Sequence, residues 1–193
     1  MIRIAILGDI GSGKSYVAKQ FGYPVFNADV EVTELYRKSR KCYSKLKKIL
    51  PNYITSFPVK KIELLKAIMA NHKNLKKIVK IIHPEIRNRM NNFIKKNRRK
   101  KLIILDIPLL IENKLNKKND ILIFVNAKKK EINKRLKKRH NPSVKILKKF
   151  QLPVEDKKKK ADFIIENNFR NNLVKKNVKK TLRNILLNAP SHT

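Results

Sequence analysis

The chain contains few glycines, cysteines and acidic residues, and each shortage narrows what the protein can be. Its 193 residues include 4 Gly, 1 Cys and no Trp, and 14 acidic residues face 49 Lys and Arg. A single cysteine excludes an intramolecular disulfide. Cys42 stands in a lysine-rich stretch without a metal-ligand pattern, so we expect no structural zinc and a solvated or half-buried thiol without a role.

Long hydrophobic runs are also missing. No run approaches the about 18 apolar residues that cross a membrane, and the chain begins directly with a predicted strand in place of a cleavable signal. We therefore predict a cytoplasmic protein without a membrane partner. A hydrophobic content of 41% is enough for a core, and the length suits one α/β domain with a small helical insertion.

The net charge of +35 would attract any nucleic acid. The charge is spread over nearly every predicted helix and is carried mostly by Lys, while aromatic residues that could stack on bases make up only 7%. This distribution indicates a general compositional bias more than a binding stripe. We expect nonspecific attraction and no specific nucleic acid partner, and we keep a nucleic-acid-binding protein with a nucleotide switch as an alternative.

All four glycines lie in residues 2–22, where an apolar strand, interrupted only by Arg3, leads into a glycine-rich turn and then a helix. Gly8, Gly13, Lys14 and Ser15 satisfy the pattern G-x-x-x-x-G-K-[ST]. In this pattern backbone N–H groups surround phosphate oxygens, the lysine reaches the outer phosphates and the hydroxyl helps to hold Mg²⁺. The alternative is a strand-to-helix turn without a ligand.

Two carboxylates follow predicted strands. Asp29 ends the predicted strand 24–29, and Asp106 lies near the end of the apolar strand predicted over 101–110. Ligands of open α/β sheets collect at the carboxyl ends of the strands, so both side chains are expected near the phosphate site. Asp106 is typical of the acidic strand that orders water around Mg²⁺. Asp29 has an alternative role as the cap of a helix beginning near Val30.

Residues 30–98 contain no convincing strand and are predicted to form a helical insertion. Two apolar faces with helical spacing are expected. They comprise Val59, Ile62, Leu65 and Ile68, and Leu75, Ile78, Val79 and Ile82. The His83-Pro84 step predicts an interruption of the second helix. His83 and Arg87 are then either capping or surface residues, or contacts to a ligand.

The remaining chain completes the predicted sheet. A strand is expected over 121–125 and another over 163–165, which ends at Glu166-Asn167. Between them, a basic helix carries Arg135 and Arg139 four residues apart, a spacing that suits a polyphosphate clamp or a solvated helix face. Short helices are expected over 143–161, followed by a terminal helix that packs across the sheet, with residues 188–193 frayed. Together these segments predict a five-stranded parallel sheet.

The ordered motifs resemble those of the dephospho-coenzyme A kinase family over nearly the whole chain. They are GDIGSGKS, FNAD, HPEIR, DIPLLIE, RLKKR, FQLPVEDKKKKAD and FIIENN. The resemblance implies a three-layer phosphate-loop kinase fold with a helical substrate-binding insertion and a lid. It also implies that MgATP phosphorylates the ribose 3′-hydroxyl of dephospho-coenzyme A, the last step of coenzyme A synthesis.

The resemblance further implies residue roles. Lys14, Asp29 and Arg139 would be catalytic, with Asp29 accepting the hydroxyl proton, while Ser15 and Asp106 would serve the metal. The ATP site would comprise Gly11, Ser12, Gly13, Lys14, Ser15, Tyr16, Arg135 and Asn167, and the acceptor site Asp29, His83, Arg87 and Leu109. Residues 1–29 and 99–193 would form the nucleotide-binding core, with the lid at about 128–150, and residues 30–98 the acceptor-binding insertion.

Four residues depart from the family pattern. Leu7 replaces a usual threonine, Asp9 a glycine, Asn27 the first carboxylate of Asp-Ala-Asp, and Ile132 a common glutamine. These changes bear on rate and metal affinity more than on reaction class. A nucleoside monophosphate kinase with the same fold remains an alternative. We expect a monomer and leave a homo-oligomer open, because no helix carries an obvious unpaired apolar stripe.

Overall fold

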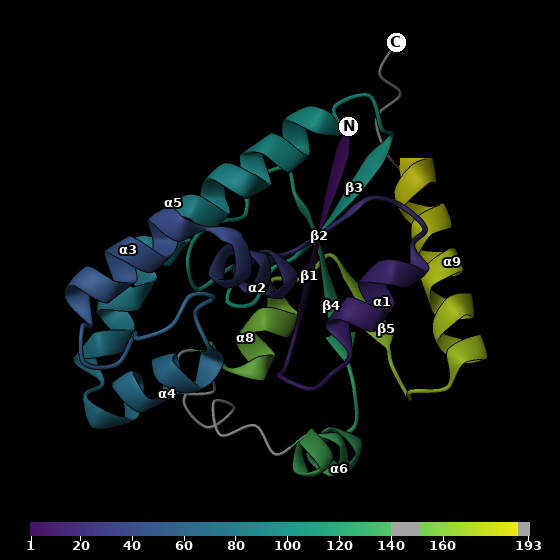
Figure 1. Cartoon of the computed structure of the whole chain (residues 1–193). Helices are drawn as coiled ribbons and strands as arrows, with labels where there is room; N and C mark the ends of the chain where they lie inside the picture. Colours follow the sequence, from purple (N-terminus) through teal and green to yellow (C-terminus); the bar gives the residue numbers. More distant parts are fainter. Residues whose placement is uncertain (140–150, 189–193) are drawn as a thin grey trace. The chain divides into compact units, whose positions relative to one another are not determined.

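The structure is a computed structural model that describes residues 1–139 and 151–188 (Figure 1). The chain forms two compact units, Ala28–Lys96 and a second one made of Met1–Asn27 and the described residues from Asn97 onward. The sequence predicts short helices over 143–161 and a frayed end over 188–193; residues 143–150 and 189–193 lie outside the described residues, and Asn188 is the last residue of a helix. No helix in the described part of the chain is long and apolar enough to cross a membrane.

The discontinuous unit is built on a five-stranded parallel sheet with the order β2-β3-β1-β4-β5. Its strands are β1 (Ile2–Gly8), β2 (Val25–Asn27), β3 (Leu102–Asp106), β4 (Ile121–Asn126) and β5 (Phe163–Glu166). β1 is central and buried on both faces, which explains its nearly continuous apolar sequence. The predicted α/β fold class is confirmed, and β3 is shorter than the predicted strand 101–110 because the chain turns after Asp106.

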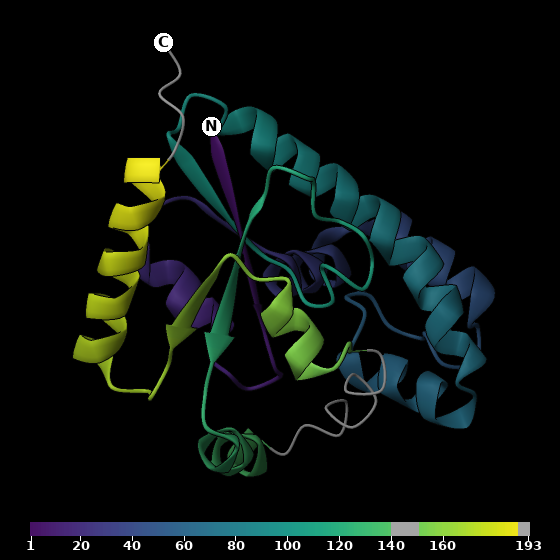
Figure 2. The same cartoon turned by 180° about the vertical axis from the view of Figure 1, so that it is seen from behind.

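Helices cover both faces of this sheet. They are α1 (Lys14–Gln20), α8 (Val154–Lys159) and α9 (Asn171–Asn188), whereas α6 (Lys129–Arg139) follows β4 and lies beyond the carboxyl end of that strand (Figures 1 and 2). Seen from opposite sides, Figures 1 and 2 place α1 on one face and α8 on the other. α1 packs beside α9, and its Val17, Ala18 and Phe21 belong to the hydrophobic core of the sheet unit. On α9, which packs on the sheet as predicted, the buried positions include Val174 and Val178, whereas Leu173 is exposed.

Arg3, the one charge in the apolar run of β1, is paired inside the sheet unit. Its Nε lies 2.9 Å from Asp120 Oδ1, and its Nη2 donates a hydrogen bond of 3.0 Å to Asp120 Oδ2. Asp120 immediately precedes β4 and also accepts from the N–H of Lys117 at 2.9 Å. The ion pair, with its single hydrogen bond from Nη2, offsets part of the cost of burying the guanidinium, while Nε has no hydrogen-bond partner among the described residues.

The unit Ala28–Lys96 is helical, and no strand occurs within these residues, all of which are described. It contains α2 (Ala28–Lys38), α3 (Arg40–Ile49), α4 (Lys61–Ala70) and α5 (Lys73–Lys96). Cys42 belongs to its core beside Leu46 and is 1% exposed, so the expectation of a solvated or half-buried thiol is wrong. Burial, together with the charge of Glu85, raises the pKa of Cys42 to about 11, which makes the thiol a structural apolar group.

Two expectations for the helical unit are corrected by packing. On α4 the buried face contains Leu64 and Ala67, while Ile62 is exposed. The interruption expected at His83-Pro84 does not occur: α5 is a single helix of 24 residues, Lys73–Lys96, that contains Pro84 in its interior. Burial of Ile82 and Met90 on either side of the proline supplies tertiary contacts that outweigh its local preference.

The turn before α4 is organised by the buried carboxylate of Glu63. It accepts hydrogen bonds from the N–H and hydroxyl of Thr55, from the N–H and hydroxyl of Ser56, and from the N–H of Lys60, at 2.7–3.2 Å. Burial alone would raise the pKa of Glu63, but the donors at Thr55, Lys60 and Ser56 outweigh it and hold the pKa at about 2.

We expect Glu63→Gln to lower the free energy of unfolding near neutral pH by about 1–3 kcal/mol, because several buried donors lose a charged acceptor. The folded pKa lies below the ordinary value of 4.5, so the carboxylate stabilises the fold above that value and the stabilisation is lost as the pH falls from 4.5 toward 2. Urea unfolding followed by circular dichroism across this range measures both effects. Glu34→Gln, which removes a half-buried carboxylate paired with Lys38 on α2, is the matched control; equal pH dependence in the two variants would contradict the prediction.

Candidate active site

The glycine-rich turn between β1 and α1 brings two other segments close to its backbone. Gly11 and Gly13 have φ angles of 86° and 88°, which favour glycine. A Cβ on Gly11 would lie 3.1 Å from Leu136 of α6, and a Cβ on Gly13 would collide with the amide of Asn167. The glycines therefore permit both the turn and the close approach of α6 and of the segment after β5.

The side chains of the turn are directed at its own backbone. Lys14 Nζ donates to the carbonyl oxygens of Asp9 at 2.9 Å and of Gly8 at 3.2 Å. The carboxylate of Asp9, which replaces the usual glycine, accepts from the N–H of Ile10 at 2.7 Å. The hydroxyl of Ser12 is buried and has no hydrogen-bond partner among the described residues. The first turn of α1 adds N–H groups that an α-helix leaves without intrahelical partners, so the site suits an anion.

Asn167 fastens the segment after β5 to the glycine-rich turn. Its side chain is buried, donates to the carbonyl oxygen of Ser12 at 2.7 Å, and accepts from the N–H of Phe169 at 2.9 Å. Phe169 has a φ of 62°, unusual for a bulky residue, and its ring lies 4.4 Å from the guanidinium carbon of Arg135 on α6. The structure thus brings Arg135 and Asn167, both predicted from the sequence, to the same turn.

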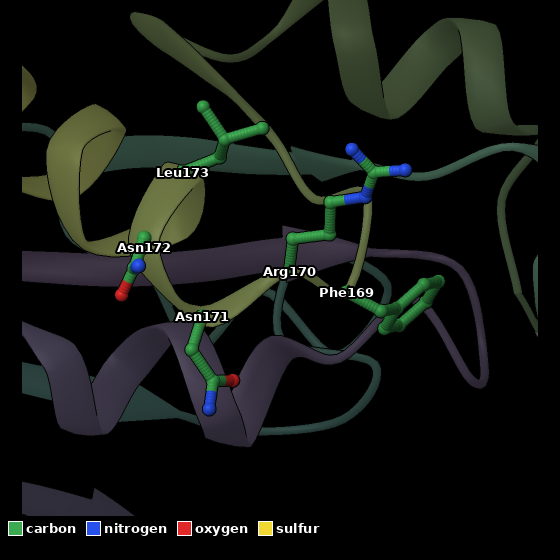
Figure 3. A pocket seen from close by; sticks show the side chains of 5 residues that line it. All are labelled: Phe169, Arg170, Asn171, Asn172 and Leu173. Carbon is green, nitrogen blue, oxygen red and sulfur yellow. The ribbon is translucent and has the colours of Figure 1, made fainter.

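An open pocket of about 570 Å³ lies beside this turn. Figure 3 shows its lining side chains, which come from the turn before α9 and from the first residues of that helix. They are Phe169, Arg170, Asn171, Asn172 and Leu173. The hydroxyl of Tyr16 on α1 donates to Asn171 Oδ1 at 2.9 Å, which places the predicted residue Tyr16 beside the pocket.

The carboxyl ends of β2 and β3 gather three polar side chains. Asn27 and Asp106 are register partners, and the Asn27 amide donates to Asp106 Oδ2 at 2.5 Å and to Ser15 Oγ at 3.4 Å. An aspartate at position 27 would repel the carboxylate of Asp106, whereas the amide of Asn27 donates a hydrogen bond to it. No cluster of three His, Cys, Asp or Glu side chains suited to a metal occurs in the described parts of the chain. The Ser15 and Asp106 oxygens nevertheless fit Mg²⁺ completed by phosphate oxygens and water.

Other predicted site residues lie elsewhere. Asp29 does not end a strand, because β2 stops at Asn27; it is an exposed residue in the first turn of α2, where its charge favours the helix N-terminus. His83 and Arg87 are exposed on α5 in the same helical unit. Partial burial, and then the charge of Arg87, lower the pKa of His83. The side chain of Arg139, the last residue of α6, lies outside the described residues.

A small cavity beside the turn is lined in part by Glu112 and Lys157, to which the sequence analysis assigned no role. It measures about 10 Å³, and its lining includes Gly8, Lys14 and the predicted residue Leu109 together with Glu112 and Lys157. Glu112 stands in the DIPLLIE motif, but Lys157 is the first of four consecutive lysines. Nothing in that run distinguishes the buried lysine from its neighbours, so only the structure identifies it.

The fold and site define a protein class. A parallel sheet whose central strand leads through G-x-x-x-x-G-K-S into a helix, with an acidic strand beside it, is the arrangement of phosphate-loop kinases. Residues 2–172 match the sequence family described as dephospho-CoA kinase. The chain belongs to the dephospho-CoA kinase family, whose members are phosphotransferases that use ATP.

Individual relatives agree with this assignment. A dephospho-CoA kinase from Wolbachia pipientis wMel is 31% identical over 193 residues, which cover 96% of this chain and 99% of that protein. The solved structure of TT1252 from Thermus thermophilus is 26% identical, with a TM-score of 0.74 and 98% of both chains covered. A Campylobacter jejuni dephospho-CoA kinase, 22% identical with a TM-score of 0.64, covers 95% of this chain and 96% of its own and shares the fold.

Proposed function

We propose that the protein transfers the γ-phosphoryl group of ATP to the ribose 3′-hydroxyl of dephospho-coenzyme A, giving coenzyme A and ADP. The observation that carries the proposal is the family match over residues 2–172, which includes the glycine-rich turn and every motif up to the segment after β5. The proposed reaction is the dephospho-CoA kinase activity for which the family is described.

The phosphate end of the reaction is assigned to the sheet unit. The N–H groups of residues 11–16 bind the ATP phosphates, and Lys14 leaves its carbonyl acceptors to contact the outer phosphates. Ser15 and Asp106 hold Mg²⁺, which when bound neutralises charge on the phosphates. Arg135 and Arg139 are assigned to the polyphosphate, and Asn167 keeps the turn in shape through Ser12.

The acceptor end is assigned to the helical unit, for which the sequence indicated residues 30–98. Asp29 is the proposed base, because it is the carboxylate that follows β2 by two residues and a sugar hydroxyl must lose its proton during transfer. His83, Arg87 and Leu109 are proposed to border the acceptor. The lid predicted at about 128–150 begins with α6 and is proposed to close over bound phosphates to exclude water.

The proposed setting is a cytoplasmic enzyme that works as a monomer, with a homo-oligomer as the alternative. Its substrates are small molecules, so we assign it no specific nucleic acid partner and no membrane partner. The net charge of +35 then acts only through nonspecific attraction that salt weakens.

A coupled ADP-release assay over a panel of acceptors tests the function. We expect dephospho-coenzyme A with MgATP to stimulate ADP release at least about tenfold over the acceptor-free rate, because a positioned hydroxyl replaces adventitious water as the acceptor. Nucleoside monophosphates and shikimate are the matched controls and should not stimulate. Stimulation by a nucleoside monophosphate without stimulation by dephospho-coenzyme A would reject the proposed acceptor and favour the nucleoside monophosphate kinase alternative.

A further inference from the structure

Lys157 on α8 carries a deeply buried ammonium group. Its side chain is 3% exposed, and Nζ has no hydrogen-bond partner within residues 1–139 and 151–188. The nearest carboxylate oxygen is Glu112 Oε1 at 3.9 Å, beyond hydrogen-bond distance. That oxygen already accepts from the N–H of Leu152 at 3.0 Å. The ammonium is therefore only loosely paired.

Such a group is a poor contributor to stability. Removing an ammonium from water is costly, and a distant carboxylate without hydrogen bonds offsets only part of that cost. Burial accordingly lowers the pKa of Lys157, although the charges of Glu112 and Asp9 act to raise it. An apolar side chain of similar length would fill the same space at no electrostatic cost, so stability does not explain the lysine.

Lys157 lies close to the start of the glycine-rich turn, where its charge can act on a bound anion. Lys157 and Glu112 line the cavity of about 10 Å³ that also contacts Gly8 and Lys14, at the start of the glycine-rich turn. α8 packs against β1, the strand that delivers this turn. In this interior a positive charge is screened much less than on the surface, and it acts on anions held by the neighbouring backbone.

We propose that Lys157 is a further cation of the phosphate site, a positioning residue whose buried charge strengthens binding of the nucleotide's polyphosphate on the glycine-rich turn. It acts through space from behind the turn, whereas Lys14 belongs to the turn itself. The inference rests on the proposed function in that the turn holds ATP, and it deepens that function by adding a residue to the site. Glu112 accepts a hydrogen bond from the N–H of Leu152 and, like Lys157, lines the cavity.

The test compares Lys157→Met with Lys159→Met. Both changes remove one lysine charge from α8, but Lys159 is exposed. We expect Lys157→Met to raise the Kd of MgATP and of inorganic triphosphate about fivefold to tenfold, the effect of one weakly screened charge near a polyanion. Lys159→Met should change both constants less than about twofold, because an exposed charge is screened by water and salt. The KM for ATP should rise with the Kd, while kcat stays within about threefold.

Thermal unfolding of the same variants separates the charge from a structural role. The melting temperature of Lys157→Met should equal or exceed that of the wild type, because the substitution removes a buried charge whose only ion pair within the described residues, with Glu112 at 3.9 Å, includes no hydrogen bond. A variant that unfolds, or one with wild-type affinity for MgATP and triphosphate, overturns the inference. Because binding is measured without an acceptor, failure of dephospho-coenzyme A as substrate would reject the proposed function and leave this test intact.

Discussion

Asp29→Asn should slow turnover of dephospho-coenzyme A by ~10²-fold or more, the usual contribution of a positioned base, while the Kd of MgATP changes little. The substitution keeps the shape of the side chain and much of its ability to interact with the first turn of α2, but it cannot accept the hydroxyl proton. Steady-state ADP release and an equilibrium titration with MgATP measure the two quantities separately.

Asp106→Asn is the informative comparison for Asp29. Asp106 is 3% exposed and bonded to Asn27 beside Ser15, so its loss should weaken Mg²⁺ binding and raise the Mg²⁺ concentration needed for half-maximal rate. If Asp29→Asn keeps near-normal turnover while Asp106→Asn abolishes it, the assignment of the two carboxylates is wrong.

Lys14→Met should reduce kcat/KM for ATP by ~10²–10³-fold, the range found when one preorganised donor to a developing negative charge is removed. Methionine preserves the length of the side chain and suits a helix, so α1 should still form at Lys14–Gln20. In the absence of ligand, the variant loses the two bonds to the carbonyl oxygens of Gly8 and Asp9. The measurement is the initial rate as a function of ATP at saturating acceptor.

Lys19→Met supplies the control for Lys14. Lys19 lies in the last turn of the same helix and is exposed, so its loss changes the net charge equally without touching the turn. The control should keep kcat/KM within about twofold. Equal losses in the two variants would show that general charge attraction, and not a specific contact from Lys14, accounts for the effect.

The sequence predicted the features that depend on neighbouring residues. The first strand, the glycine-rich turn and the helix after it follow from a local apolar run and from a fixed motif, and the structure has all three. The approximate place of Asp106 was likewise predictable, because it ends an unbroken apolar run.

Features that depend on distant residues could not be predicted in this way. The partner of Arg3 is Asp120, which is 117 residues away, and the inward turn of Glu63 depends on donors from a loop. The continuity of α5 through Pro84 depends on tertiary packing that a local rule does not contain. Lys157 shows the same limit, since its burial follows from the position of α8 on the sheet.

The hydrogen bond from Asn167 to Ser12 links the segment after the edge strand β5 to the turn after the central strand β1. β5 is the last strand, held on one side only, and its alignment pairs Val125 with Ile165 and Asn126 with Glu166. A slip of one residue would turn the strand's side chains to the opposite faces and carry the Asn167 amide away from Ser12. The shape of the glycine-rich turn therefore depends on strand alignment at the border of the sheet, where a change in sequence would otherwise be expected to have little effect on a distant site.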